Sequence, residues 1–203
     1  MSAVRPTVVV KVGGSLLGWP RLPERLAGVL AGRAGDRCVL VVGGGPAADW
    51  VRSLDRDHGL GPDRAHALAL RALDLTAHAL AGLVTGLQVL DDPEALTLCW
   101  EAGRIPVLAP RRFLDREDRD SPDPLPHTWD VTTDAIAARL AVSLGTSELV
   151  LLKSAPLPPG ADRAEAARRG LVDPAFVGAS RGLARVSYVN LRDDPPTTSA
   201  LPG

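Results

Sequence analysis

The sequence predicts an α/β protein built on a mainly parallel β-sheet that is covered by helices. Two observations favour this fold class. Short segments that are apolar at successive positions are typical of strands buried on both faces, and they alternate with helical segments along the whole chain. Parallel strands need crossover connections of this kind, so a three-layer αβα sandwich is expected.

Six strands are expected from the apolar segments, at residues 8–12, 38–42, 87–90, 105–109, 148–152 and 185–189. Apolar residues at helical spacing predict helices at residues 22–30, 46–54, 63–83, 93–102, 132–144 and 162–169. Pro46 suits the start of its helix, Thr132 is expected to cap another, and Gly145 marks where that helix stops. No repeat or linker divides the chain.

Two segments stand apart from this pattern. Residues 111–126 are charged and contain prolines, and they are expected to form an exposed loop or, alternatively, a lid over a site. Residues 193–203 are rich in Pro, Thr and Ser and are expected to be a disordered tail. Residues 1–192 are therefore expected to form a single domain.

Composition excludes several classes of function. A net charge of −1 over 203 residues argues against a nucleic-acid-binding protein, and 3% aromatic residues leave little for base stacking. No apolar run approaches the length of a membrane span, and the first six residues lack the pattern of a signal peptide. Cys38 and Cys99 are isolated in apolar segments and are expected to be buried free thiols. A cytoplasmic protein is expected.

Candidate ligand-binding residues fall where predicted strands end. They are the segment Lys11-Val12-Gly13-Gly14-Ser15, the run Gly43-Gly44-Gly45-Pro46, and Lys153-Ser154. In an open α/β sheet ligands bind beyond the carboxyl ends of the strands. Glycines let backbone N–H groups approach an anion and lysines neutralise phosphate oxygens, so this set suits MgATP and a second anion. The alternative interpretation is a tight strand-to-helix turn beside an ordinary surface lysine.

The common motifs of other enzyme classes are absent. No Walker phosphate loop occurs, the run after residue 42 lacks the last glycine of a dinucleotide fingerprint, and no Gly-x-Ser-x-Gly elbow is found. The four histidines are His58, His66, His78 and His127, and they show no metal-ligand spacing. Each is expected to be a loop or helix-face residue, so no protein-held metal is predicted.

The order of these motifs resembles the amino acid kinase superfamily, which includes acetylglutamate, aspartate, glutamate and uridylate kinases. The lysine-bearing first strand, the glycine run after the second and Asp134 at the start of a late Ala-rich helix carry the resemblance, over roughly residues 7–192. It implies a carbamate kinase-like fold and phosphoryl transfer from ATP with Mg²⁺ to a small anionic acceptor. Because dimers are common in the superfamily, it also implies a homo-oligomer.

Three segments are more similar to one branch of that superfamily. These are residues 65–70 with 73–75, residues 127–134 (His-Thr-Trp-Asp-Val-Thr-Thr-Asp) and residues 171–176. They resemble the small kinases of methanofuran biosynthesis, which transfer the γ-phosphate of ATP to aminomethylfuran phosphate. The implied context is the biosynthesis of a one-carbon cofactor.

The resemblance also implies roles for individual residues. Lys11 would bridge the ATP phosphates and the transferred group, and Asp134 would hold this lysine in place. Asp130 would face the acceptor or magnesium. The alternative for both aspartates is helix capping and first-turn charge, which needs no ligand. Ser15 would support the nucleotide phosphates. The remaining implied residues are Gly13, Gly14, Gly44 and Gly45 as N–H donors to the phosphoryl group, and Gly43, His66 and Asp74 in the acceptor pocket.

The chain departs from the family pattern at two places. Lys153-Ser154 stands where relatives usually have Thr-Asp and a glycine-bearing turn, and no later Gly-Met-x-x-Lys segment supplies a second lysine. Lys153 itself or an arginine such as Arg181 is then expected to provide the second positive charge. A non-catalytic protein that binds a nucleotide or an anion, and an amino acid or uridylate kinase, remain as alternatives.

Overall fold

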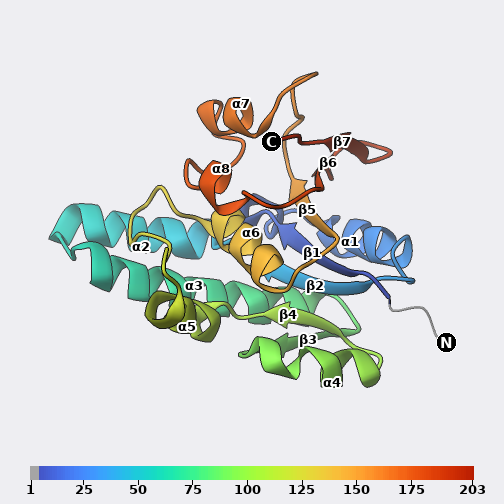
Figure 1. The fold of residues 1–203 in the computed structure, drawn as a ribbon, viewed down its shortest axis with the longest axis horizontal. Coiled ribbons are helices and arrows are strands. Elements are labelled where there is room, and N and C mark those ends of the chain that lie inside the picture. Colours follow the sequence, from blue (N-terminus) through green and yellow to red (C-terminus); the bar gives the residue numbers. More distant parts are fainter. Residues whose placement is uncertain (1–4) are drawn as a thin grey trace.

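A computed structural model describes residues 5–203 as a central seven-stranded sheet between two layers of helices (Figure 1). The strands follow the order β3-β4-β2-β1-β5-β6-β7, and each neighbouring pair is parallel except the last. The predicted three-layer αβα class is thus confirmed. The expectation of no signal peptide rests mainly on residues 1–4, which lie outside the described residues.

The strands agree with the predicted ones to within one residue at each end, and one further strand follows them. Their bounds are β1 Thr7–Val12, β2 Arg37–Val42, β3 Leu87–Leu90, β4 Ile105–Leu108, β5 Glu148–Lys153, β6 Val186–Asn190 and β7 Thr197–Ala200. The helices are α1 Leu22–Ala31, α2 Gly45–His58, α3 Pro62–Leu83, α4 Leu96–Glu101, α5 Arg111–Asp120, α6 Thr133–Ser143, α7 Arg163–Arg168 and α8 Phe176–Ala179. Two short 3₁₀ turns complete the set, η1 Gly14–Leu16 and η2 Pro93–Ala95.

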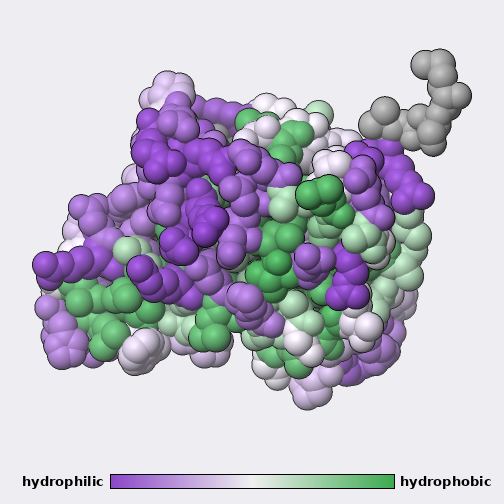
Figure 2. All heavy atoms as spheres, turned by 90° about the horizontal axis from the view of Figure 1, so that it is seen from below, coloured by the Kyte–Doolittle hydropathy of each residue, from purple (hydrophilic) through white to green (hydrophobic). Residues whose placement is uncertain are grey.

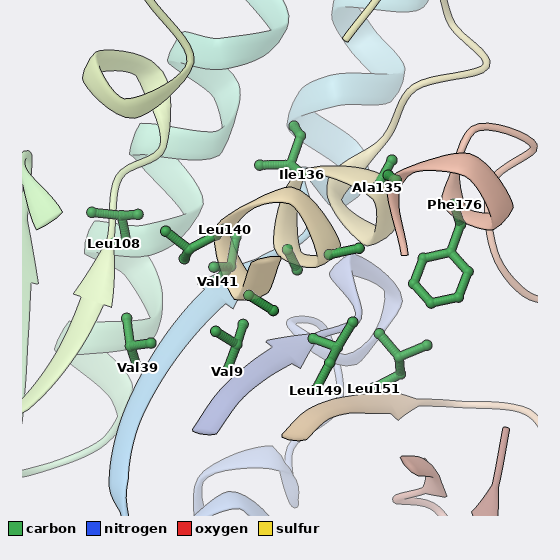
Figure 3. Packing of buried hydrophobic residues seen from close by; sticks show 14 of the residues in the cluster. Val9, Val39, Val41, Leu108, Ala135, Ile136, Leu140, Leu149, Leu151 and Phe176 are labelled. Carbon is green, nitrogen blue, oxygen red and sulfur yellow. The ribbon is translucent and has the colours of Figure 1, made fainter. Parts of the chain in front are cut away.

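Alternate residues of the central strands pack on opposite faces of the sheet, as the two-residue period of a strand requires. Val9 of β1 and Leu151 of β5 join a core with α6 and α8, which Figure 3 shows around Ile136 and Phe176. Val8, Val10 and Val12 join a second core with α1 and the C-terminal half of α3. Both faces of β1 are therefore buried, which explains why its sequence is apolar at successive positions.

The segment 111–126 was expected to be a loop or a lid, and this is wrong for its first ten residues. They form helix α5, whose Phe113 and Leu114 are buried against the α6-side core. The charged residues occupy its other faces, where Arg111 lies 3.6 Å from Asp115 one turn later. Two apolar residues in a charged helix gave too weak a periodicity to predict it.

The prediction of a disordered tail is also wrong. Residues 197–200 form β7, which pairs antiparallel with β6, and Leu201 beyond it is buried. The Arg163 guanidinium, itself buried, donates to the carbonyl oxygen of Leu201. A polar strand at the edge of a sheet carries little hydrophobic signal, so the composition of the tail concealed it.

Smaller expectations have mixed outcomes. Cys38 and Cys99 are buried free thiols, as predicted. Helix α2 continues to His58, beyond its predicted end at residue 54, and Gly59 closes it with a φ of 60°. No helix among residues 5–203 is both long and apolar enough to cross a membrane.

Seen from below, hydrophobic residues form several separate groups on a largely hydrophilic face (Figure 2).

Candidate active site

Two lysines lie at the carboxyl ends of neighbouring strands and on the same face of the sheet. Lys11 follows Val9 on β1 at a spacing of two, and Lys153 follows Leu151 on β5 in the same way. Because Val9 and Leu151 pack on the α6 side, both lysines point toward the start of α6. The two-residue period of the strands therefore places two ammonium groups beneath one helix N-terminus.

Asp134, in the first turn of α6, is shared by these two lysines. Lys153 Nζ lies 2.6 Å from one carboxylate oxygen, and Lys11 Nζ lies 2.9 Å from the other. Lys153 also donates to the carbonyl oxygen of Leu171 at 2.6 Å. The Lys11 contact is an ion pair that is not aligned as a hydrogen bond, since Asp134 Oδ1 has no hydrogen-bonded donor. An ammonium group has three N–H donors, so Lys11 keeps at least two of them for another acceptor.

Burial and charge shift the pKa values of this triad in opposite directions. Burial would raise the pKa of Asp134, but Lys11 and Lys153 hold it below its ordinary value. Burial and the nearby charge of Lys11 lower the pKa of Lys153 to about 8, against the opposing pull of Asp134. Two ammonium groups and one carboxylate leave one positive charge within the triad, although the nearby Asp173 offsets part of it. Lys11 is the ammonium group that lines the adjoining cavity and is available to an anion there.

The two glycine loops contact each other through their backbones. A Cβ atom on Gly14 would collide with the backbone N and Cα of Gly45, and one on Gly43 would lie 2.5 Å from the backbone N of Gly14. Gly45 also has a φ of 48°, which side chains of L-residues rarely adopt. These glycines are therefore required by the close approach of the loops after β1 and β2, whether or not a ligand is bound.

The backbone N–H groups of the loops divide into two sets. Gly13 N donates to Leu152 O at 2.9 Å and Gly43 N donates to Val12 O at 2.8 Å, so the sheet uses both. The predicted donation from Gly13 to a phosphoryl group is wrong for this reason, and Gly43 has no N–H left for an acceptor. Within residues 5–203 we find no acceptor for the N–H groups of three other glycines, Gly14, Gly44 and Gly45.

A cavity of about 460 Å³ opens beside these groups. Its wall combines the Lys11 side chain, Ser15 and the free glycine N–H groups with residues of α2, α3 and α6. Arg52 of α2 and Trp129 also line it, with the guanidinium stacked 4.7 Å from the centre of the indole ring. The structure thus brings together most of the residues that the sequence singled out.

Of four further residues named from the sequence, one lines the cavity and three lie outside its lining. His66 of α3 lines the cavity. Asp130 is exposed and lies outside the cavity lining, and so does Asp74, which pairs with Arg111. Arg181 lies in a separate hollow beside Asp123. The arginine in the cavity wall is Arg52, which no feature of the sequence selected.

Asp173 is the buried functional candidate that the sequence reasoning missed. Its Oδ2 atom accepts hydrogen bonds from the N–H groups of Thr132 and Ala135 and from the Thr132 hydroxyl. The N-cap position of Thr132 is thus as predicted, but its hydroxyl binds Asp173 instead of the helix. Burial and the neighbouring Asp134 charge raise the pKa of Asp173 to about 6. Its segment was noted for its resemblance, but Asp173 itself was not selected.

Ser154, which the sequence grouped with Lys153 but gave no role of its own, contacts the first loop. Its hydroxyl lies 2.9 Å from that of Ser15, so the turn after β5 is tied to the loop after β1. The pair is exposed at the edge of the sheet where Lys11 and Lys153 emerge. This contact joins the two loops that the sequence assigned separately to phosphate binding.

Comparison with known proteins agrees with this arrangement. The sequence model of the amino acid kinase family matches residues 6–156, well over half of the chain. The chain therefore belongs to the amino acid kinase family. This confirms the resemblance predicted from the lysine-bearing strand, the glycine run and the aspartate that opens α6.

One relative of known activity is similar to most of this chain. A [5-(aminomethyl)furan-3-yl]methyl phosphate kinase from Methanocaldococcus jannaschii is 26% identical over 145 residues, which cover 70% of this chain and 63% of that protein. The match therefore spans less than two thirds of the length of that relative. It is nevertheless a kinase of the branch that the three short segments indicated.

Solved structures share the fold at lower identity. A uridylate kinase from Archaeoglobus fulgidus superposes with a TM-score of 0.60 and 20% identity, covering 89% of each chain. A UMP kinase from Ureaplasma parvum superposes with a TM-score of 0.67 and 13% identity, covering 98% of this chain and all of that one. Their agreement shows the fold and not the substrate.

Proposed function

We propose that this chain is an ATP-dependent phosphotransferase that moves the γ-phosphate to a small anionic acceptor. The observation that carries the proposal is the Lys11–Asp134–Lys153 triad beside three free glycine N–H groups. Phosphoryl transfer depends mainly on positioning and on neutralising charge, and the cavity wall supplies both. Membership of a kinase family supports the same reaction class.

The residues of the cavity would act on the phosphates directly. Lys11, fixed by Asp134 but with donors to spare, would neutralise oxygens of the transferred group. The N–H groups of Gly14, Gly44 and Gly45 would bind the same oxygens from the loop side, as preorganised dipoles. We propose direct in-line transfer between donor and acceptor, with positioning and charge neutralisation as the main sources of catalysis.

The residues present fit ATP as a substrate better than they fit a protein-held metal. Asp134 is taken up by two ammonium groups, and Asp49, the carboxylate in the cavity wall, is exposed and paired with Arg52. Mg²⁺ ordinarily keeps several waters and binds through substrate phosphates. We therefore propose that Mg²⁺ arrives with ATP and neutralises phosphate charge, while the chain contributes the lysines and the N–H groups.

For the acceptor we propose a phosphomonoester of a small ring, with aminomethylfuran phosphate as the first compound to test. Support comes from the named activity of the Methanocaldococcus jannaschii relative. Arg52 and the ring of Trp129 in the cavity wall suit an anion attached to a flat ring. The corresponding setting would be one-carbon cofactor biosynthesis in the cytoplasm.

We also propose that the chain works as a homo-oligomer. Leu68 and Leu75 lie two turns apart on α3 and are 37% and 62% exposed. These two side chains on one helix face would be covered by a second copy of the chain. Sedimentation of the purified protein would distinguish this from a monomer.

The decisive experiment measures MgATP turnover against furan phosphates, amino acids and nucleoside monophosphates. We expect turnover with a phosphorylated ring, and a fall of about 100-fold or more in Lys11→Met, because a preorganised charge is lost. Lys11→Met should still unfold cooperatively. The control is Arg5→Met, a substitution at an exposed residue that lies away from the cavity. Unchanged turnover in Lys11→Met would rule out the proposed mechanism.

A non-catalytic nucleotide- or anion-binding protein is the second candidate. It is favoured by one observation, that Lys153 is held by Asp134 and Leu171 O and does not line the cavity. Calorimetry of ATP binding, together with an assay of ADP release, distinguishes a binding protein from a kinase. A binding protein would take up ATP but release no ADP with any acceptor in the panel.

A further inference from the structure

His66 and His127 lie close together in the structure, although they are 61 residues apart in the sequence. His66 lies on α3, and His127 lies in the segment between α5 and α6. Asp118, near the end of α5, lies with them. One potential ligand atom from each of the three residues lies within 4.8 Å of the other two. No sequence motif predicts this group, because each residue comes from a different element.

The distances within the group suit a shared cation. His127 Nε2 lies 3.1 Å from Asp118 Oδ2. Two ligands of a tetrahedral Zn²⁺, each about 2.0–2.2 Å from the metal, are separated by a similar distance. His66 Nε2 is buried and has no hydrogen-bond partner among the described residues. A buried imidazole nitrogen without a partner is costly, and binding a metal would satisfy it.

Asp63 provides a separate observation. Its Oδ1 atom lies 2.8 Å from Nδ1 of His127, on the opposite side of the ring from Asp118. Metal-binding histidines nearly always donate their second ring N–H to a carboxylate or carbonyl, which fixes the tautomer. With the proton on Nδ1, the Nε2 lone pair of His127 is directed toward Asp118.

We propose that His66, His127 and Asp118 form a binding site for a divalent transition metal, best suited to Zn²⁺, with Asp63 orienting His127. Two imidazoles and one carboxylate match the three-ligand zinc sites that keep a fourth position open. The two imidazole rings are stacked, with centroids 3.8 Å apart and planes 12° apart. One ring must therefore turn about its Cβ–Cγ bond to direct both nitrogens at one ion, and this torsion is broad.

The proposed metal site lies beside the proposed phosphate cavity. His66 lines the proposed phosphate cavity and also a neighbouring cavity of about 270 Å³, whose wall includes His127. Trp129 belongs to both walls as well, two residues after His127. A metal bound here would fix the segment before α6 to α3 and α5, and so hold Trp129 over the acceptor end of the cavity.

Proton binding competes with the metal. Although burial alone would lower it, the pKa of His127 is raised by Asp63 and Asp118. Burial and His127 lower the pKa of His66, which leaves this ring neutral and ready to bind. The charged groups around the pair are Asp63, Asp115 and Asp118. Zn²⁺ binds the neutral form of both imidazoles, so its affinity should fall as the pH is lowered.

The test titrates the metal-free full chain with Zn²⁺ against a chromophoric chelator, without nucleotide, so that its outcome is independent of kinase activity. We expect one Zn²⁺ per chain. His66→Gln, His127→Gln and Asp118→Asn should each abolish this site, and Asp63→Asn should weaken it by about 10–100-fold. His78→Gln is the matched control, because His78 is an exposed histidine on the same helix.

Two outcomes would overturn the proposal. One is the absence of a stoichiometric equivalent in the unaltered chain, which would mean that His127 is simply an imidazolium held between two carboxylates. The other is retention of the equivalent in all three ligand variants. Far-ultraviolet circular dichroism confirms that each variant is folded, and visible absorption of bound Co²⁺ gives a second readout of four-coordinate geometry.

Discussion

Asp134 Oδ2 lies 2.6 Å from Lys153 Nζ, while the other oxygen of the same carboxylate is left to Lys11. The carboxylate is buried, and so is most of each lysine side chain. One aspartate in the first turn of α6 thus compensates two ammonium groups. The stability of the site and the position of Lys11 both depend on this single side chain.

The first prediction concerns this dependence. Asp134→Asn should lower the free energy of unfolding by about 3–5 kcal/mol, because it leaves buried charges without their partner. Urea-induced unfolding measures the change. Adding Lys153→Met removes one of the stranded charges and should restore part of the loss. A loss below about 1 kcal/mol in the single variant would show that water, and not Asp134, compensates the lysines.

The second prediction concerns the pH dependence of turnover. The pKa of Lys153 lies at about 8, so its charge is lost in the folded protein above that pH. Positive charge beside the phosphates then falls, and kcat/KM should decline above pH 8. In Lys153→Arg the guanidinium stays charged, so the alkaline decline should disappear. The same decline in both proteins would assign it to another group.

The third prediction concerns the contact of the two glycine loops. A methyl group on Gly14 would collide with the backbone of Gly45, so Gly14→Ala should destabilise the fold and reduce turnover. Gly28→Ala is the matched control, because Gly28 is exposed on α1 and a Cβ atom there meets nothing within 4 Å. It should stabilise the helix by about 0.5–1 kcal/mol. Thermal unfolding and turnover are measured for both variants. Equal melting temperatures of Gly14→Ala and Gly28→Ala would contradict the close approach of the two loops.

The fourth prediction concerns the pH dependence of stability through Asp173. Its pKa is about 6 in the folded protein and 3.8 in the unfolded chain. Between these values the folded state binds the proton first, so lowering the pH through this window favours folding, and the gain is lost as the pH rises through 6. Relative to Asp173→Asn, the chain should gain about 2–3 kcal/mol between pH 7 and pH 4. Urea titrations of both proteins across that range measure it, and a constant difference would show that Asp173 is already neutral or well solvated at pH 7.

The hydrogen bonds to Asp173 give a related comparison at fixed pH. Asp173→Ala leaves the N–H groups of Thr132 and Ala135 without an acceptor at the start of α6. At pH 7 it should therefore be less stable than Asp173→Asn by about 1–3 kcal/mol, because the asparagine carbonyl still accepts. Equal stabilities would mean that water replaces the lost acceptor.

The pattern of apolar residues along the chain is enough to predict the layers of the fold and much of the site. Uninterrupted apolar runs such as residues 38–42 require burial on both faces, and this requirement predicts a parallel sheet between helices. Lys11 was found because it lies next to the last residue of such a run, and Lys153 because it directly follows one. Ligands of open α/β sheets bind at those ends, so position in the sequence was enough to select them.

Tertiary structure alone decided how these residues are used. Gly13 and Gly14 are adjacent and identical in sequence, yet the sheet takes the N–H of the first and leaves that of the second. Arg52, Asp173 and the His66–His127 pair carry no local signal, because their partners are distant in sequence and near only after α2, α3 and α6 have packed. Hydrophobic periodicity reports what is buried, whereas the pairing of polar groups depends on which elements meet.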